Sequence, residues 1–398
     1  MQTDPLSIKS LLEPLFSINS FTLGSERHGY ILQLRGIPLE NDSIIFYEKV
    51  SKILEPYQCS AVFERDSENF ALTIIPLPSR RSKMKPSVNL VLFLITLISV
   101  LFTGGVMSIE QELPSDLFSA IREIVANGWP FALSLLAILG AHEFGHYFIG
   151  RARGIDVTLP FFIPMPLSML GTMGAFINIR SLPKNKRALF DMAVAGPLSG
   201  LIISIIVLII GLRLSYVSTL PISFTTQNAI QMEGNSILYL LLKRIILGLW
   251  LPSPVGLEGV FVPGFWASFF FTSTPYPAGG MDVILHPVAW AGWAGLLVTS
   301  LNLIPAGQLD GGHIFYALFG KKNIQRLMPV VLGSLVLLGF GWFTWWIWAL
   351  LLFFMGQSHA EPLDRVTELD PKRRWLGYAM LFVFIFTFMP VPIAIFGL

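Results

Sequence analysis

Long apolar stretches alternate with short charged segments along most of this chain. The stretches that carry almost no charge are 88–106, 129–150, 189–212, 287–305, 327–340, 342–355 and 375–396. Most of them come close to the roughly 20 residues that an α-helix needs to cross a bilayer. The pattern predicts a polytopic α-helical membrane protein with about seven transmembrane helices. The two short stretches after residue 327 also fit one broken span or a hairpin.

Residues 1–83 differ from the rest, because they mix charges of both signs with short alternating segments. Segments 30–34 and 70–75 alternate like strands, and 44–54 has a helical pattern between them. We expect a small cytoplasmic α/β domain over 1–83 and a membrane-embedded domain over 84–398. A folding or docking role is favoured for the N-terminal domain over a catalytic one.

A long insertion, residues 215–285, separates the third and fourth apolar stretches. It contains a helical pattern at 236–250 and an apolar segment at 255–280 that proline and glycine interrupt too often for a confident span. Packing at the membrane interface is favoured for this segment over a substrate-filtering lid or a re-entrant element.

Composition supports the membrane assignment and limits the kinds of binding partner that we expect. The chain is 53% hydrophobic and only 13% charged, with a mean hydropathy of +0.65. Its formal charge of +2 predicts no nucleic-acid partner, and the lipid bilayer is the expected surroundings. The single cysteine, Cys59, excludes both an intrachain disulfide and a cysteine-based zinc site.

Loop charges orient the predicted spans, because basic residues concentrate on the cytoplasmic side. Arg80, Arg81, Lys83 and Lys85 precede the first span. The loops that fall on the same side contain Arg151, Arg153, Lys184, Lys186, Arg187, Lys321, Lys322, Arg326, Arg365, Lys372, Arg373 and Arg374. The opposite side carries Arg122, Arg213, Lys243 and Arg244. We therefore expect a cytoplasmic N-terminus and an external insertion.

The second apolar stretch contains the sequence HEFGH at 142–146. Ionisable side chains in hydrocarbon cost about 3 kcal/mol each at a helix centre, so such a cluster marks a functional site. Residues four apart share a helix face, so His142 and His146 can present ring nitrogens to one metal ion. Catalytic zinc usually takes a third protein ligand and leaves a fourth position for water, and Glu143 is the expected general base.

Two aspartates near the predicted spans are candidates for the third ligand. Asp191 opens the third apolar stretch, where an N-cap explains it better. Asp310 lies in NLIPAGQLDGGH, on the side of the membrane where the loop charges place HEFGH. Proline and glycine break the helix there, which is tolerated at membrane depth only where the backbone is buried or lines a water-filled cavity. A solvated turn aspartate is the alternative. We predict one Zn²⁺ per chain, with the ligands His142, His146 and Asp310.

These motifs together resemble the site-2 protease family of intramembrane zinc metalloproteases. HEFGH stands in one span, and Asn-x-x-Pro and LDGG stand in a later one. The resemblance covers about 141–312 and includes GTMGAFI and AGPLSG. Segments 286–296 and 362–370 are similar to the branch found in chloroplasts and prokaryotes, and no PDZ-like insertion is evident. The family implies a zinc metalloendopeptidase with a catalytic core at about 130–320. We expect a prokaryotic cell membrane, with the active site toward the cytoplasm.

The resemblance also implies a reaction. Members hydrolyse a peptide bond in or near a transmembrane segment of another membrane protein. Similar enzymes place a small membrane-associated β element beside the metal, and 157–180 alternates like a strand. Its edge is expected to pair with unwound substrate. Asn302, about two helical turns before Asp310, is a second candidate catalytic residue that can donate a hydrogen bond to the oxyanion. An interhelical polar contact is the alternative for Asn302.

Two other functions stay open. A membrane-embedded zinc peptidase that cuts at the membrane surface would take a later glutamate as third ligand, and none follows the motif in a comparable place. A non-catalytic metal-binding membrane protein would not need Glu143 and would carry polar residues across several spans. The predicted spans are otherwise nearly free of charge. The sequence predicts neither the substrate nor the oligomeric state.

Overall fold

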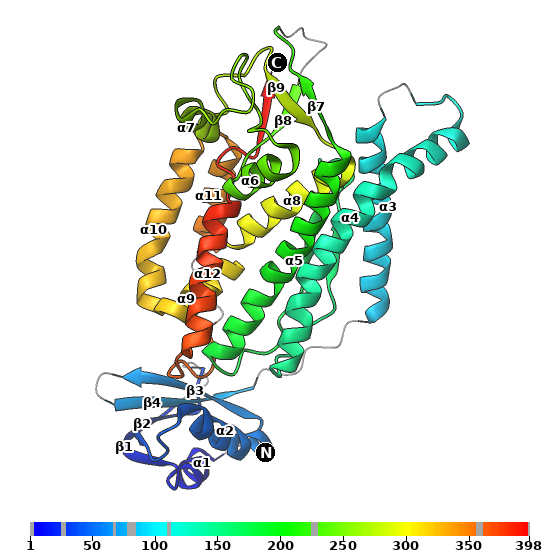
Figure 1. The fold of residues 1–398 in the computed structure, drawn as a ribbon. Coiled ribbons are helices and arrows are strands. Elements are labelled where there is room, and N and C mark those ends of the chain that lie inside the picture. Colours follow the sequence, from blue (N-terminus) through cyan, green and yellow to red (C-terminus); the bar gives the residue numbers. More distant parts are fainter. Residues whose placement is uncertain are drawn as a thin grey trace.

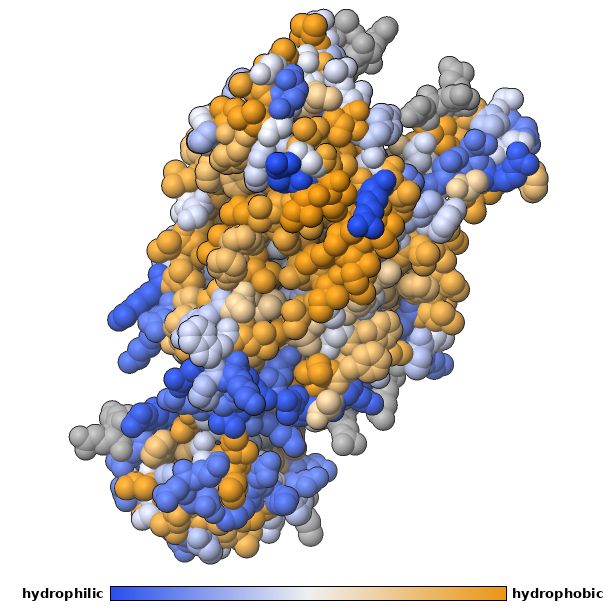
Figure 2. Space-filling view, in the orientation of Figure 1, coloured by the Kyte–Doolittle hydropathy of each residue, from blue (hydrophilic) through white to orange (hydrophobic). Residues whose placement is uncertain are grey.

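The computed structural model describes residues 4–24, 29–66, 69–77, 85–109, 113–223, 230–355 and 361–396. A bundle of helices fills the middle of the molecule, with a small sheet at one end and loops with short strands at the other (Figure 1). The surface of the bundle is mainly hydrophobic, and the small sheet is mainly hydrophilic (Figure 2). The predicted basic linker residues Arg80, Arg81 and Lys83 lie outside the described residues.

Within the described ranges, three helices are long and apolar enough to cross a membrane. They are α3 (Pro86–Ser108), α4 (Leu117–Ala152) and α5 (Lys186–Leu214). The 23 residues of α3 rise about 35 Å, against a hydrocarbon core of about 30 Å. The predicted class of helical membrane protein is therefore confirmed, whereas the count of seven spans is not.

Helix α4 begins well before the predicted start at 129. The side chain of Asp116 caps it by accepting hydrogen bonds from the backbone N–H groups of Phe118 and Ser119. Helix α5 packs along α4, where the Ser199 hydroxyl donates to the carbonyl of Ala141 over 2.7 Å. This contact fixes the two helices against each other close to the HEFGH motif.

Shorter helices complete the bundle. They are α8 (Pro287–Asn302), α9 (Asp310–Phe319), α10 (Lys321–Leu338), α11 (Thr344–Met355) and α12 (Pro371–Thr387). The predicted helix break near Asp310 is present and occupies residues 303–309. Gly311 and Gly312 are not part of this break, because both are buried inside α9.

The last predicted span, 375–396, is wrong in its second half. Helix α12 ends at Thr387, and Ile393–Phe396 forms the strand β10. Pro390 and Pro392 stand between them, and proline in a helix interior removes a hydrogen bond and clashes with the preceding turn. The apolar pattern does not distinguish one long helix from a shorter helix followed by an apolar strand.

The 215–285 insertion forms a cap on the end of the bundle far from the small sheet (Figure 1). Its elements are β7 (Tyr216–Thr219), β8 (Ile230–Glu233), α6 (Ile237–Leu247), α7 (Pro263–Thr272) and β9 (Met281–Ile284). Strand β7 pairs antiparallel with β9, and β8 pairs antiparallel with β10. The predicted helix at 236–250 corresponds to α6, which the Ser236 side chain caps at its start.

The N-terminal residues form an antiparallel sheet in the order β1-β2-β4-β3, together with two helices. The elements are α1 (Pro5–Leu12), β1 (Phe16–Leu23), β2 (Leu32–Pro38), α2 (Ser43–Leu54), the short 3₁₀ helix η2 (Glu55–Tyr57), β3 (Cys59–Asp66) and β4 (Asn69–Pro76). Phe16, Phe46 and Phe63 belong to its buried core. The sheet contacts the segment before α12, where the backbone N–H of Phe63 donates to the carbonyl of Leu363 over 2.8 Å.

A β-hairpin lies between α4 and α5 in the sequence. Its strands are β5 (Phe161–Pro164) and β6 (Thr172–Phe176), paired antiparallel. Strand β5 packs against α3, and the Ser99 hydroxyl donates to the carbonyl of Gly171 at the turn. The alternation at 157–180 thus corresponds to a real hairpin in the described structure.

Candidate metal centre

Helix α4 places the HEFGH side chains in the interior of the bundle. His142 and His146 are 4% and 6% exposed, and their Nε2 atoms lie 3.1 Å apart. The four-residue spacing brings both rings to one helix face, as the sequence predicted. Glu143, the residue after His142 on the same helix, is 6% exposed.

Asp310 is the first residue of α9 and reaches the two histidines from the other side. Its Oδ2 atom lies 3.4 Å from His142 Nε2 and 3.3 Å from His146 Nε2. The helix break at 303–309 turns the chain so that α9 starts at the level of the motif on α4. The structure therefore brings together the three residues that the sequence proposed as ligands.

The separations among the three donor atoms fit a tetrahedral metal ion. Zinc binds histidine nitrogen and carboxylate oxygen at about 2.0–2.1 Å, so ligands at tetrahedral corners lie about 3.3 Å apart. The three measured separations, 3.1, 3.3 and 3.4 Å, agree with this value. Among the described residues, this is the one group of three or more His, Cys, Asp and Glu side chains placed to hold a metal.

Two groups on α5 fix the orientation of His146. Its Nδ1 atom lies 2.8 Å from the carbonyl oxygen of Met192, which leaves Nε2 directed toward Asp310. Gly196 lies against the same ring, since a Cβ atom built there would stand 2.0 Å from His146 Nε2. The sequence alone pointed to no role at the metal centre for Gly196 or Met192.

Asn302 ends α8 next to the donor group. Its Nδ2 atom lies 3.3 Å from His142 Nε2. This position is compatible with a hydrogen bond to a substrate carbonyl and equally with a polar contact between α8 and α4, so both interpretations from the sequence stay in place. His313 is buried one turn into α9 and lies outside the group of three.

Asp191, the other aspartate considered as a ligand, lies elsewhere. The predicted N-cap role is wrong, because the side chain of Asn185 caps α5 at the backbone N–H of Ala188. Asp191 instead binds Arg373 of α12 at 2.7 and 2.8 Å and Arg153 at 2.6 Å. It therefore joins three segments of the bundle rather than binding a metal.

The hairpin lies beside the general-base candidate. The backbone N–H of Ile177, the residue after β6, interacts with the Glu143 carboxylate. In the described part of the chain, β6 pairs only with β5, so its other edge has no strand partner. The carboxylates of Glu143 and Asp310 and the imidazoles of the two histidines thus lie next to an unpaired strand edge.

Comparison with known proteins gives a consistent result. The family model described as Peptidase family M50 matches residues 130–339, more than half of the chain. The probable zinc metalloprotease EGY2, chloroplastic, of Arabidopsis thaliana is 30% identical over 302 residues, which is 72% of this chain and 46% of that protein. The protein of the same name from Oryza sativa subsp. indica is 26% identical over 399 residues, 97% of this chain and 66% of its own length. The chain thus spans about half to two thirds of these relatives.

Proposed function

The chain belongs to peptidase family M50, as the site-2 protease resemblance predicted, and on this premise we propose that it is an intramembrane zinc metalloprotease. Its substrates are membrane proteins, in which it hydrolyses a peptide bond in or near a transmembrane segment. One observation carries the proposal. His142, His146 and Asp310 form a metal-sized group beside Glu143, and the two histidines of this group lie on α4, a helix long and apolar enough to cross a membrane.

The proposed ligands are His142, His146 and Asp310. Zinc held by them supplies Lewis acidity, which activates water near neutral pH. Glu143 accepts the proton of the attacking water and returns it to the leaving amine. Burial of Glu143 keeps bulk water away from this proton transfer, and the carbonyl of Met192 holds the His146 ring in the orientation that the ligand set needs.

We assign Asn302 a positioning role for the substrate carbonyl. Its amide nitrogen faces the donor group from α8, and one well-placed donor to a developing oxyanion contributes about 3 kcal/mol. The open edge of β6 is proposed to bind an extended stretch of substrate through main-chain hydrogen bonds. Pairing there exposes a scissile bond that an intact substrate helix would hide.

In this proposal the membrane domain contains the helices α3, α4, α5, α8, α10 and α12. Helix α11 packs against α10, and the two form a helical hairpin. Helix α11 rises only about 18 Å over its 12 residues, so we do not give it a full span of its own. The excess of basic residues on the side of the N-terminal sheet orients that sheet and the metal centre toward the cytoplasm. The relatives are named chloroplastic, so the prokaryotic membrane stays a prediction.

The test is a Glu143→Gln variant of the full chain, purified in detergent and assayed for zinc content and for cleavage of a single-span model substrate. We expect zinc to be retained and cleavage to fall by about 100-fold or more, because the proton acceptor is lost. The matched control is Glu123→Gln near the other end of the same helix, which should cleave normally. Unchanged cleavage by Glu143→Gln would remove Glu143 from the reaction.

The same assay separates the alternatives. A zinc peptidase that cuts at the membrane surface would cleave a soluble peptide of the same sequence as well as the membrane-spanning substrate. A non-catalytic metal-binding protein would hold zinc and cleave neither. We expect preferential cleavage of the membrane-spanning substrate.

A further inference from the structure

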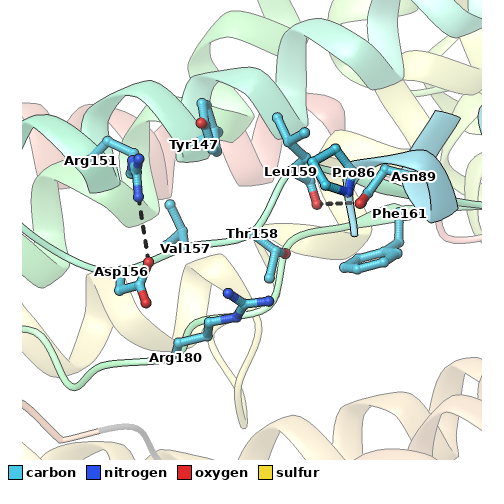
Figure 3. A pocket seen from close by; sticks show the side chains of 10 residues that line it. All are labelled: Pro86, Asn89, Tyr147, Arg151, Asp156, Val157, Thr158, Leu159, Phe161 and Arg180. Atoms are coloured by element: carbon cyan, nitrogen blue, oxygen red, sulfur yellow. Dashed lines mark hydrogen bonds and ion pairs between the residues drawn. The ribbon is translucent and has the colours of Figure 1, made fainter. Parts of the chain in front are cut away.

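A pocket of about 280 Å³, lined by both charged and apolar residues, lies where α4 ends and the chain turns toward β5. Arg151 reaches it from the end of α4 and Arg180 from the segment that follows the hairpin, and Asp156 lies between them (Figure 3). Asn89, Tyr147 and Thr158 are its other polar lining residues. No part of the proposed reaction uses this pocket.

The two arginines differ in how they are paired. Arg151 Nη1 lies 3.4 Å from Asp156 Oδ1, a long contact between two side chains that are each about half exposed. No described carboxylate is paired with the half-buried Arg180. Two guanidinium groups against one carboxylate leave the pocket with positive charge, and arginine is well suited to bind a phosphate with two parallel hydrogen bonds.

An apolar groove of about 1050 Å³ adjoins this pocket. It lies between α3 and α4 with β5 at one end, and Phe93, Leu97, Leu133 and Leu136 are among its lining residues. Pro86, Asn89 and Leu159 line both the pocket and the groove, so the two meet at the start of α3. Along α3 the groove extends from Pro86 to Leu101, about 22 Å, which exceeds the roughly 15 Å of one hydrocarbon leaflet.

The groove is separate from the proposed path of the substrate. Its lining includes Phe162 of β5 but no residue of β6, of the metal group or of the end of α8. Strand β6 lies between β5 and Glu143, since the residue after it contacts that carboxylate. An occupant of the groove would therefore lie behind the hairpin, away from the reacting groups.

We propose that the pocket and the groove together bind one anionic phospholipid of the phosphatidylglycerol class. Its phosphate binds Arg151 and Arg180, and a hydroxyl of the headgroup donates to Asp156. One acyl chain lies between α3 and α4. The proposal requires that these two helices lie in a membrane, and it is independent of whether the chain cleaves peptides.

Such a lipid would contact the residues that hold the hairpin in place. The Asn89 amide donates to the carbonyls of Leu159 and Pro160 over 3.0 and 2.9 Å, which ties the start of β5 to α3. Because Asn89 lines both the pocket and the groove, the bound lipid covers this tie from the membrane side. Lipid binding is thus expected to stabilise the position of β5 and of the strand paired with it.

The experiment is native mass spectrometry of the full chain in detergent, titrated with phosphatidylglycerol or with phosphatidylcholine of the same acyl chains. We expect phosphatidylglycerol to bind tighter by about tenfold or more, and the double variant Arg151→Gln, Arg180→Gln to lose that preference. The double variant Arg122→Gln, Arg213→Gln is the matched control, since it removes the same number of charges at the ends of α4 and α5 far from the pocket. Equal binding of the two lipids, or an unchanged preference in the double variant, overturns the headgroup site.

A second variant tests the groove. Gly140 lines the groove, and a Cβ atom built there meets no atom within 4 Å, so Gly140→Leu should place an apolar side chain in the groove. We expect it to weaken phosphatidylglycerol binding about tenfold. Unchanged lipid affinity in this variant overturns the acyl site. Displacement of the lipid by an equal concentration of glycerol phosphate would show a site for free phosphates and overturn the lipid assignment.

Discussion

Gly196 shows how a residue without chemistry of its own decides the geometry of the metal group. It stands where α5 passes beneath the His146 ring, and any side chain there would occupy the space of the ring. Met192, one helical turn earlier, supplies the carbonyl that fixes the same ring. The ligand set therefore depends on α5 although none of its members lies on that helix.

Replacing Gly196 by alanine should disable the metal group. The added Cβ would stand 2.0 Å from His146 Nε2, so the ring must move away from His142 and Asp310. We expect zinc affinity to fall by about tenfold or more, measured by competition with a chelator. Gly333→Ala on α10, where a Cβ meets nothing within 4 Å, is the control. Wild-type zinc affinity in Gly196→Ala would contradict this account of the packing.

Asp310→Asn tests the third ligand directly. The substitution keeps the size of the side chain but removes the negative charge that the two imidazoles face at 3.3 and 3.4 Å. Zinc content, measured by mass spectrometry of metals, should fall from about one per chain toward zero. A variant that retained full zinc would exclude Asp310 from the ligand set. Asp191→Asn is the matched control, because Asp191 binds arginines and should leave the zinc content unchanged.

For single residues, the sequence pointed to the proposed ligands and the proposed general base. It did not point to the residues that hold the His146 ring in place. HEFGH and LDGG are local patterns, and local patterns can be read without coordinates. Met192 and Gly196 act through contacts with a residue of another helix, so no spacing in the sequence reveals them. Asp191 was misassigned for the same reason, since its partners Arg153 and Arg373 are distant in sequence.

Among the elements, the hydrophobic pattern located apolar segments better than it defined their ends. It placed α3, α4 and α5 correctly, and it placed the helix break before Asp310. It failed at 375–396, because the strand β10 and the end of a helix are equally apolar in sequence. It also missed the early start of α4, which depends on the cap at Asp116 rather than on hydrophobicity.

The cap formed by residues 215–285 contains a buried charge cluster that no apolar pattern predicts. Glu233 of β8 accepts a hydrogen bond from the Tyr239 hydroxyl over 2.8 Å, and Lys243 Nζ lies 3.9 Å from its Oε1. Asp282 of β9 is buried in the same region. Burial, together with the nearby Asp282 carboxylate, raises the pKa of Glu233 from 4.5 to about 7.

This shift predicts a pH dependence of the cap. Folded Glu233 holds its proton more tightly than the unfolded chain does, so its contribution to stability is present below pH 4.5 and is lost as the pH rises to about 7. Hydrogen exchange of α6 and β9, corrected for intrinsic rates, should therefore be slower at pH 5 than at pH 7.5. Glu233→Gln should reduce that difference, whereas the exposed Glu258→Gln should retain it. Exchange independent of pH in the wild type would contradict the prediction.

Across the whole molecule, the segment before α12 joins the N-terminal sheet to the bundle. Asp364 makes isolated bridges both to Phe63 of β3 and to Asn185, the residue that caps α5. Arg365 adds an ion pair of 2.7 Å to Glu64. The sequence related this segment only to a family branch, because a strand of one or two residues leaves no periodic signal. Its role as a joint follows from the structure.

Asp364→Ala should loosen this joint. The Asp364 side chain is fully buried and accepts hydrogen bonds from the backbone N–H groups of Val366 and Thr367. Leaving buried donors without a partner costs about 1–3 kcal/mol. Hydrogen exchange should rise in β3 and at the start of α5 together, whereas Asp66→Ala, which removes an exposed ion pair, should leave α5 unchanged. A rise confined to β3 would show that the segment does not join the two parts.

The residues of the metal group lie on two helices, α4 and α9, and this affects when the group is completed during protein synthesis. With the ligands as proposed, a growing chain that has reached His146 holds only two of the three donors. Translation at about 5–20 residues per second needs roughly 10 to 30 s more to reach Asp310. During that interval the partly made protein holds an incomplete group of donors, so with these ligands the metal site is finished only once α9 has been made.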